Sequence, residues 1–240
     1  MKNYLIVGII TIAALGFGGA KIRAQEAKSS PTATQNKPQY EEWSDDFTGD
    51  KLDGKKWEKY TFEGGSGGKL EVKDGSVQIR SAGKTRAGIR TKDSFSGDRF
   101  AVEGRISKVG AAFPESGGSI STLGFGTLTV LFDGSGRNRI EWMLTNEGTL
   151  EAWSVVDGRG ERLDNKKLAT KMKNPVLLVV RKGDEFSFYL NDAKGAPQDA
   201  EMALKATVKN LPKSFHVMLY GYGSSENNWD GVRVTVPKSN

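Results

Sequence analysis

The sequence contains no cysteine, and this absence limits how the chain can be held together. Without cysteine there is no disulfide framework and no residue for a lipid-modified cysteine anchor. The folded part must therefore depend on an ordinary hydrophobic core. A chain of 240 residues is long enough to build one.

Histidine is nearly absent as well, because His216 is the only one in the chain. A single histidine cannot assemble a zinc site from several imidazoles. A Ser-His-Asp triad would need a nucleophile elbow, and the one match to its G-x-S-x-G pattern, Gly64–Gly68, is a run of glycines around Ser66 rather than a turn between a strand and a helix. We therefore expect His216 to be an ordinary strand residue.

Long apolar runs are also missing, apart from the one at Leu5–Ala20. This run follows the basic Lys2 and ends in small residues, and it is short for a membrane span. The pattern predicts a signal peptide over residues 1–24, cut after Ala20 or Ala24, and no stable membrane span after cleavage. The protein is then expected to be secreted, either into a periplasm or out of the cell.

The formal net charge of +6 comes from scattered lysines and arginines rather than from one basic stripe. Nucleic-acid-binding proteins gather such charge with base-stacking aromatics. The pattern therefore indicates a solvated surface and argues against a nucleic-acid partner. The polar, proline-containing residues 25–40 are expected to form a disordered linker.

From residue 41 onward, glycine is frequent and apolar residues recur with a period of two. Residues 69–81 show this best, because alternating residues flank Asp74-Gly75, which is a hairpin signal. About a dozen such segments, with one short helix expected around Asp199–Ala206, indicate an all-β chain. We predict one antiparallel two-sheet jelly-roll sandwich over residues 41–240.

Three stretches of the chain resemble one known group of jelly rolls. Residues 45–58 carry an Asp-Phe pair, a Leu-Asp and a Trp, in the order in which concanavalin A-like lectin/glucanase domains often begin. Residues 87–106 resemble a segment of laminarinase-type family-16 glycosidases, and residues 229–236 resemble their closing strand. The resemblance covers most of residues 41–237 and implies a concave sheet that holds a polysaccharide or another glycan.

Family-16 enzymes carry E-x-D-x-E or E-x-D-x-x-E on one strand, and the matching strand here is Asn138–Thr145. If Glu141 takes the place of the family's Asp, Arg139 stands where the nucleophile should be. Met143, or Leu144 in the longer form, then replaces the acid/base Glu. Retaining hydrolysis needs two carboxylates about 5–5.5 Å apart. The resemblance therefore implies the fold without the family's catalytic pair.

The segment Asn138–Trp153 is itself predicted to be a hairpin. Its turn, Asn146-Glu147-Gly148, fits a three-residue loop that ends with glycine in the left-handed region. This loop pairs Glu141 with Trp153. Side chains then alternate between an apolar face and a mixed face that carries Arg139, Glu141, Met143, Glu151 and Trp153.

The mixed face suits a sugar, because an indole stacks on a pyranose while carboxylates and arginine bind hydroxyls. An ordinary half-exposed sheet surface would carry the same residue types. Further candidate ligand residues lie in a glycine-rich segment, namely Tyr220, Tyr222, Asn227, Asn228 and Trp229. No cofactor is required, although the resemblance implies that Asp230 and first-strand backbone oxygens help to bind a structural calcium.

Three functions agree with these observations. The sequence favours a secreted carbohydrate-binding jelly roll without conventional glycosidase activity. The second is a divergent glycoside hydrolase that uses Glu141 and Glu151, or a loop carboxylate such as Glu115. The third is a non-catalytic scaffold domain of the cell envelope that binds no sugar.

Overall fold

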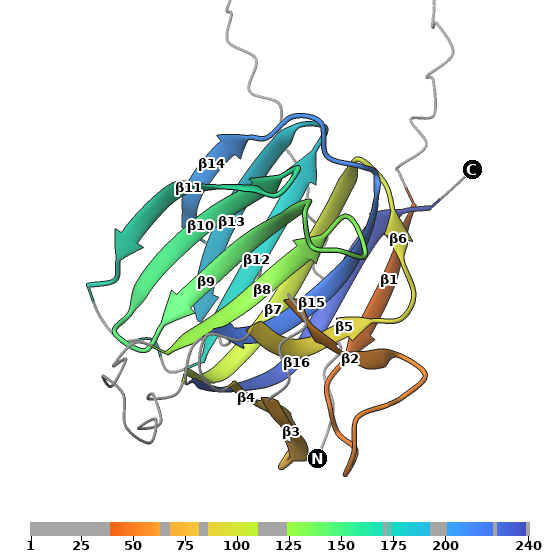
Figure 1. Ribbon diagram of the computed structural model, residues 1–240, viewed down its shortest axis with the longest axis vertical. Helices are drawn as coiled ribbons and strands as arrows, with labels where there is room; N and C mark the ends of the chain where they lie inside the picture. Colours follow the sequence, from red (N-terminus) through yellow and green to blue (C-terminus); the bar gives the residue numbers. More distant parts are fainter. Residues whose placement is uncertain are drawn as a thin grey trace, which may run out of the picture.

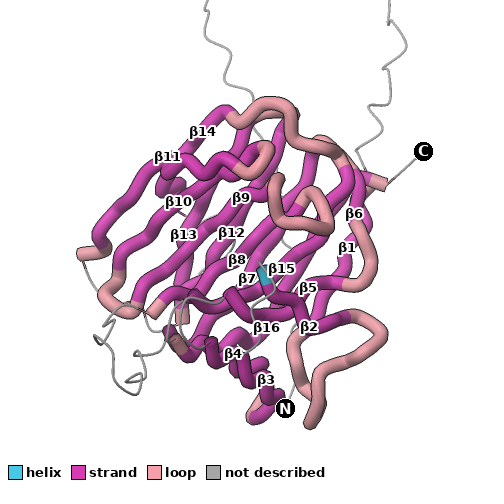
Figure 2. Tube along the Cα trace, in the orientation of Figure 1, coloured by secondary structure: helices cyan, strands magenta, loops and turns pink. Residues whose placement is uncertain are grey.

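The computed structural model describes residues 39–62, 68–81, 86–109, 124–169, 172, 174–192, 201–222 and 225–238. These ranges consist mainly of strands, which form two antiparallel sheets lying face to face (Figures 1 and 2). The predicted all-β sandwich is therefore confirmed. The predicted signal peptide, nearly all of the linker and Glu115 lie outside the described residues.

The first sheet has the strand order β14-β13-β12-β7-β16-β4-β3, and β1 also pairs with β16. Its strands are β1 (Tyr40–Asp45), β3 (Gly68–Lys73), β4 (Ser76–Ser81), β7 (Arg99–Val109), β12 (Pro175–Lys182), β13 (Glu185–Asp192), β14 (Glu201–Thr207) and β16 (Glu226–Pro237).

The second sheet has the order β11-β10-β9-β8-β15-β5-β2, and β6 also pairs with β15. Its strands are β2 (Trp57–Thr61), β5 (Arg86–Thr91), β6 (Phe95–Ser96), β8 (Phe125–Leu131), β9 (Arg139–Thr145), β10 (Thr149–Val156), β11 (Arg159–Lys167) and β15 (Ser214–Tyr222). Strands far apart in sequence, such as β8 and β15, are neighbours, as expected for a jelly roll.

The hydrophobic core fills the space between the sheets, because alternate residues of each strand point inward. Trp142 of the second sheet packs on Phe188 of the first, with ring centroids 5.3 Å apart. Its indole nitrogen donates to the backbone oxygen of Tyr189 at 3.0 Å, so the buried polar atom has a partner. Trp142 thus lies on the apolar face, as predicted, and plays no part in the outer surface.

The prediction of a short helix around Asp199–Ala206 is wrong for residues 201–206, the part of it that the structure describes. Residues from Glu201 onward form the edge strand β14, which pairs with β13. Leu204 and Ala206 pack against the core from this strand. Ala, Leu, Lys and Glu are good helix formers, but the free-energy preference of each residue is small. Pairing with β13 and packing at the edge of the sheet outweigh it.

Strand β11 was not predicted at all, because its residues are polar and almost all exposed. Strand β11 is held by backbone pairing with β10. Because its side chains are not packed in the core, its sequence shows no alternation of apolar and polar residues. Within the described residues, no helix has the length and apolar character to cross a membrane.

Candidate functional site

The hairpin formed by β9 and β10 has the predicted register. Glu141 lies opposite Trp153, and Met143 lies opposite Glu151. Gly148 has a φ of 76°, and its N–H donates to the Thr145 backbone oxygen at 3.0 Å. The three-residue turn therefore places the mixed face, as predicted, on the outer side of the second sheet.

Glu141 is sealed in the middle of this outer face, where it is only 4% exposed. Its Oε1 accepts a hydrogen bond from Arg139 Nε at 2.6 Å and another from the Tyr220 hydroxyl at 2.7 Å. Because β8 lies between β9 and β15, the Tyr220 side chain must cross β8 to reach this carboxylate. The Glu141 carboxylate is thus hydrogen-bonded to two side chains of the same sheet.

Above this network lies a group of packed side chains that we call the aromatic cap: Tyr60, Phe62, Leu131, Met218, Tyr220 and Tyr222. Phe62 packs edge-on against Tyr220, with centroids 5.6 Å apart. The Arg139 guanidinium lies 4.8 Å from the Phe62 ring centroid, a cation–π contact. The cap therefore covers the arginine and the carboxylate together.

The loop 132–138 holds the cap from the side. Gly136 has a φ of 77°, and a Cβ at this position would collide with the Phe62 ring. The Tyr60 hydroxyl donates to the Gly134 backbone oxygen at 2.7 Å. Burial raises the pKa of Tyr60, and the nearby Arg90 offsets only part of this, so its hydroxyl remains a donor.

Asp133 organises this loop. Its carboxylate accepts hydrogen bonds from the backbone N–H groups of Ser135 at 2.9 Å and Arg137 at 3.1 Å, and from Asn138 Nδ2 at 2.8 Å. Partial burial raises the pKa of Asp133, but the hydrogen bonds from Ser135, Asn138 and the backbone lower it more, so the net pKa is lowered. The ionised carboxylate keeps Gly136 against Phe62.

Two threonines lie beneath the cap on β8. Thr127 and Thr129 are fully buried, and neither hydroxyl has a hydrogen-bond partner. Thr129 stands between Glu141 and Met218 in the ladder. The middle of the outer face, where a sugar would meet β8 and β9, is therefore filled by the protein's own side chains.

The outer face opens toward β10 and β11. Here Glu151 and Trp153 are partly exposed, and the Trp153 indole nitrogen donates to Glu151 Oε2 at 2.9 Å. Arg162 lies opposite Trp153 and Asn165 lies opposite Glu151, both exposed on β11. We call these four residues the Trp153 strip. Arg162 and Asn165 were missed from the sequence because β11 was missed.

The remaining candidate ligand residues are mostly closed to solvent. Tyr220 is 1% exposed, and Asn227 and Trp229 are fully buried. Asn227 donates to the Phe125 backbone oxygen at 2.6 Å. Tyr222 is partly exposed and packs edge-on against Phe125, with centroids 5.9 Å apart. Of the tyrosines predicted to contact sugar, only Tyr222 reaches the surface.

The only histidine lies on β15, where its side chain is partly buried. His216 Nδ1 is 2.8 Å from the backbone oxygen of Thr91. This is the environment expected of an ordinary strand residue.

The two glutamates of the mixed face are diagonal neighbours on β9 and β10. Glu141 is buried against Arg139 and Tyr220, whereas Glu151 holds the Trp153 indole. A carboxylate that solvent does not reach cannot attack an anomeric carbon or protonate a leaving oxygen. Of these two carboxylates, only Glu151 is therefore open to a ligand.

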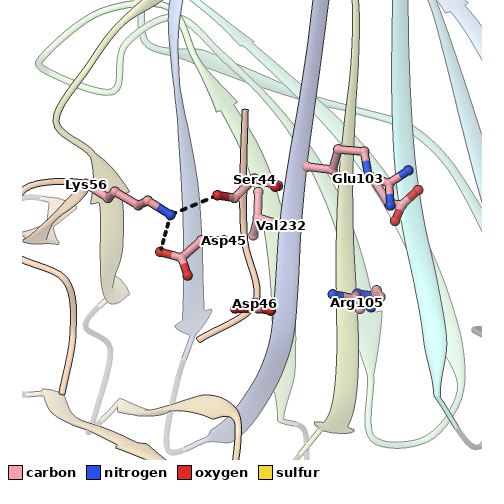
Figure 3. Close-up of a pocket in the computed structure, with 8 residues that line it drawn as sticks. Ser44, Asp45, Asp46, Lys56, Glu103, Arg105 and Val232 are labelled. Atoms are coloured by element: carbon pink, nitrogen blue, oxygen red, sulfur yellow. Dashed lines mark hydrogen bonds and ion pairs between the residues drawn. The ribbon is translucent and has the colours of Figure 1, made fainter. Parts of the chain in front are cut away.

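The oxygens expected to bind calcium already have other partners. Asp230 Oδ1 accepts a hydrogen bond from the Ser107 hydroxyl at 2.6 Å, and the Asp230 backbone oxygen lies 3.4 Å from Arg105 Nη2. On the first strand, Lys56 Nζ donates to the Ser44 backbone oxygen at 3.0 Å (Figure 3). Calcium requires free oxygens, so the donor set does not fit it well. Within the described ranges, no group of three or more His, Asp or Glu side chains could hold a metal ion.

The two sheets form a jelly roll, and solved structures of a carbohydrate-binding module and of glucanases have a similar fold. A carbohydrate-binding module, CBM66 from Bacillus subtilis, matches with a TM-score of 0.52 at 16% identity, over 72% of this chain and 91% of that chain. A Bacillus licheniformis beta-glucanase matches at 0.58 and 9% identity, over 82% and 98%. SCLam, a non-specific endo-beta-1,3(4)-glucanase from family GH16, matches at 0.57 and 14% identity, over 84% and 95%.

At such low identities these likenesses establish the fold alone. No protein-family model and no curated protein sequence matches the chain.

Proposed function

We propose that this protein binds a polysaccharide or another glycan along the Trp153 strip and does not cleave it by a two-carboxylate mechanism. One observation carries the proposal. On a single sheet face, the position of the family's catalytic strand is sealed under the aromatic cap, while Trp153 stays partly exposed beside polar side chains. The shared fold of carbohydrate-binding modules and glucanases supports the glycan as the ligand class.

The strip has the chemistry that sugar binding needs. The Trp153 indole offers an apolar ring, and Glu151, Arg162 and Asn165 offer acceptors and donors for hydroxyls. The hydrogen bond from Trp153 to Glu151 fixes the ring along β10 before any ligand arrives. A side chain that is already ordered loses less entropy on binding, which favours affinity.

The hydrolase alternative meets a physical obstacle at Glu141. Moving this carboxylate to a substrate would break its contacts with Arg139 and Tyr220 and leave a buried guanidinium without its counter-charge. Glu151 alone cannot supply both roles of the reaction. We therefore favour binding over cleavage.

A glycan array combined with reducing-end assays on β-glucans, xylans and galactans tests both parts of the proposal. We expect binding to at least one glycan, with no release of reducing ends. Trp153→Ala should weaken binding about tenfold or more, since loss of a stacked ring removes about 1.4 kcal/mol or more. Tyr40→Ala is the matched control, because Tyr40 is a 55% exposed aromatic residue on the other sheet.

Other outcomes would point elsewhere. Reducing ends released by the wild-type protein would overturn the non-catalytic part of the proposal. Equal binding by the Trp153 and Tyr40 variants would move the site away from the strip. If no glycan binds and neither variant differs from wild type, the scaffold function becomes the better explanation.

We also propose that the protein is exported and acts outside the cytoplasm. The support is the apolar run Leu5–Ala20 after Lys2, followed by small residues at the expected cleavage positions. Mass spectrometry of the protein from its native host should show a chain that begins after Ala20 or Ala24. An intact N-terminus would contradict cleavage.

A further inference from the structure

A charged groove lies on the first sheet, at the point where β1 separates from β16. The last paired residues there are Asp45 and Val232, so Asp230 and Gly231 have no partner from β1. The groove has a volume of about 360 Å³. Its lining includes three carboxylates and three cations: Asp45, Asp46, Glu103, Lys56, Arg105 and Arg233 (Figure 3).

We propose that the side chains of Lys56 and Arg105 take the place of a divalent metal ion in this groove, because they supply positive charge to the oxygens at the end of β1 and at Asp230. The resemblance implies a calcium ion held by backbone oxygens of the first strand and by Asp230 on β16. Each of these positions is already contacted by one of the two side chains. The groove lies on the first sheet, whereas the Trp153 strip lies on the second.

Lys56 neutralises the carboxylate that joins the end of β1 to the core. Its Nζ lies 3.0 Å from the Ser44 backbone oxygen and 3.7 Å from Asp45 Oδ2. The same carboxylate accepts hydrogen bonds from the Phe47 backbone N–H at 3.0 Å and from the buried Trp57 indole nitrogen at 2.8 Å. A single carboxylate thus holds the turn, and Lys56 supplies its counter-charge.

Arg105 plays the matching role on β16. It lies opposite Gly231 in the ladder, next to an irregularity in the strand pairing. A Cβ at Gly231 would collide with the guanidinium, so the arginine lies directly against the β16 backbone. Its Nη2 is 3.4 Å from the Asp230 backbone oxygen, while Ser107 donates to the Asp230 carboxylate at 2.6 Å. The guanidinium therefore covers the segment that β1 leaves unpaired.

The lining of the groove already holds as many cations as carboxylates. Lys56 and Arg105 therefore supply positive charge where a divalent ion would otherwise supply it. Without Lys56 and Arg105, the lining would keep three carboxylates and one cation, Arg233, whose Nε lies 3.8 Å from Glu42 Oε1. Carboxylate and carbonyl oxygens are the ligands that calcium prefers.

Thermal unfolding with chelator or with millimolar calcium tests the proposal on the full chain. We expect the wild-type Tm to be the same in both conditions. Lys56→Met should lower the Tm by roughly 2–4 °C, and Lys56→Arg should restore most of it. Lys55→Met is the matched control, because the neighbouring lysine is exposed and should change little.

The double variant Lys56→Met/Arg105→Met provides the decisive measurement. Calcium should raise its Tm, because a ligand that binds only the folded state stabilises it. A folded double variant that shows no such rise would overturn the proposal. So would a wild-type Tm that falls with chelator and recovers with calcium, a result that can be obtained even if the double variant fails to fold.

Discussion

The outer face of the second sheet has two halves that differ in access although they are built alike. Both use alternate residues of neighbouring antiparallel strands, and both combine an aromatic ring, an arginine and a glutamate. In one half, Phe62 and the loop 132–138 cover Arg139 and Glu141. In the other half, Trp153 and Glu151 remain partly exposed beside β11. The difference shows that residues outside the strands decide which polar groups a ligand can reach.

The same contrast separates buried polar groups from exposed polar groups, to which we assign ligand binding. Glu141 and Arg139 satisfy each other in a buried setting, where loss of either leaves an unpaired charge. Glu151 and Arg162 face water, where loss of one group changes stability little. The following predictions test this division, from the largest effect to the smallest.

Glu141→Gln should have the largest effect on stability. Removing the charge leaves Arg139 buried without its partner, which should cost about 3 kcal/mol or more of unfolding free energy. Glu151→Gln is the matched control on the open half and should change it by less than about 0.5 kcal/mol. Urea unfolding followed by tryptophan fluorescence measures both. Equal losses would mean that the two halves do not differ as described.

Gly136→Ala should be the next largest. The added Cβ meets the Phe62 ring at a backbone φ of 77°, so both crowding and strain oppose it. We expect a loss of about 1–3 kcal/mol. Gly134→Ala lies in the same loop with nothing within 4 Å of the new Cβ, and it should be near neutral. If the two variants unfold alike, Phe62 is not held by Gly136.

Arg162→Ala tests the open half through binding rather than through stability. Loss of one hydrogen-bonding group should weaken glycan binding about three- to tenfold, with the Tm almost unchanged. Arg159→Ala is the control, because Arg159 is exposed on the same strand but pairs with Val156, which packs toward the core. Isothermal titration with a glycan identified on the array gives both affinities. If the two variants bind the glycan with the same affinity, Arg162 does not contact the ligand.

The smallest expected effect is a pH dependence from Asp133. Its pKa is lowered in the folded protein, so its contribution to stability is complete above the unfolded-state pKa of about 3.9. That contribution is lost as the pH falls through the folded-state pKa. Asp133→Asn should therefore flatten the stability profile in this acidic range and change little at neutral pH. Parallel profiles for both proteins would contradict this.

Much of the fold could be predicted because it depends on local chemistry. Glycine at position 148 can take the left-handed conformation, and this turn alone sets the pairing of Glu141 with Trp153. The strand from Glu201 and the strand from Arg159 could not be predicted in the same way. Both lie at sheet edges, where pairing with one neighbour decides the conformation and apolar alternation is weak or absent.

The site was predicted only in part for a related reason. Tyr60 and Phe62 stand two residues apart, so the sequence could have placed them on one face of a strand. Their contact with Tyr220 depends on β5 lying between β2 and β15 in the sheet, which no local pattern reveals. For this reason Tyr220 and Glu141 are predicted from the sequence as ligand contacts, whereas the structure places Tyr220 within the cap and Glu141 beneath it.

The sequence by itself determined that this chain is a cysteine-free β-sandwich and that Arg139 and Met143 stand on either side of Glu141 in its β9 strand. Those properties follow from alternation, turn residues and residue identity, which are local. Only the tertiary structure decided that Glu141 is sealed, that Trp153 is open, and that Lys56 and Arg105 occupy the charged groove. Burial and charge pairing join residues that are distant in the chain, so they exist only once the two sheets have formed.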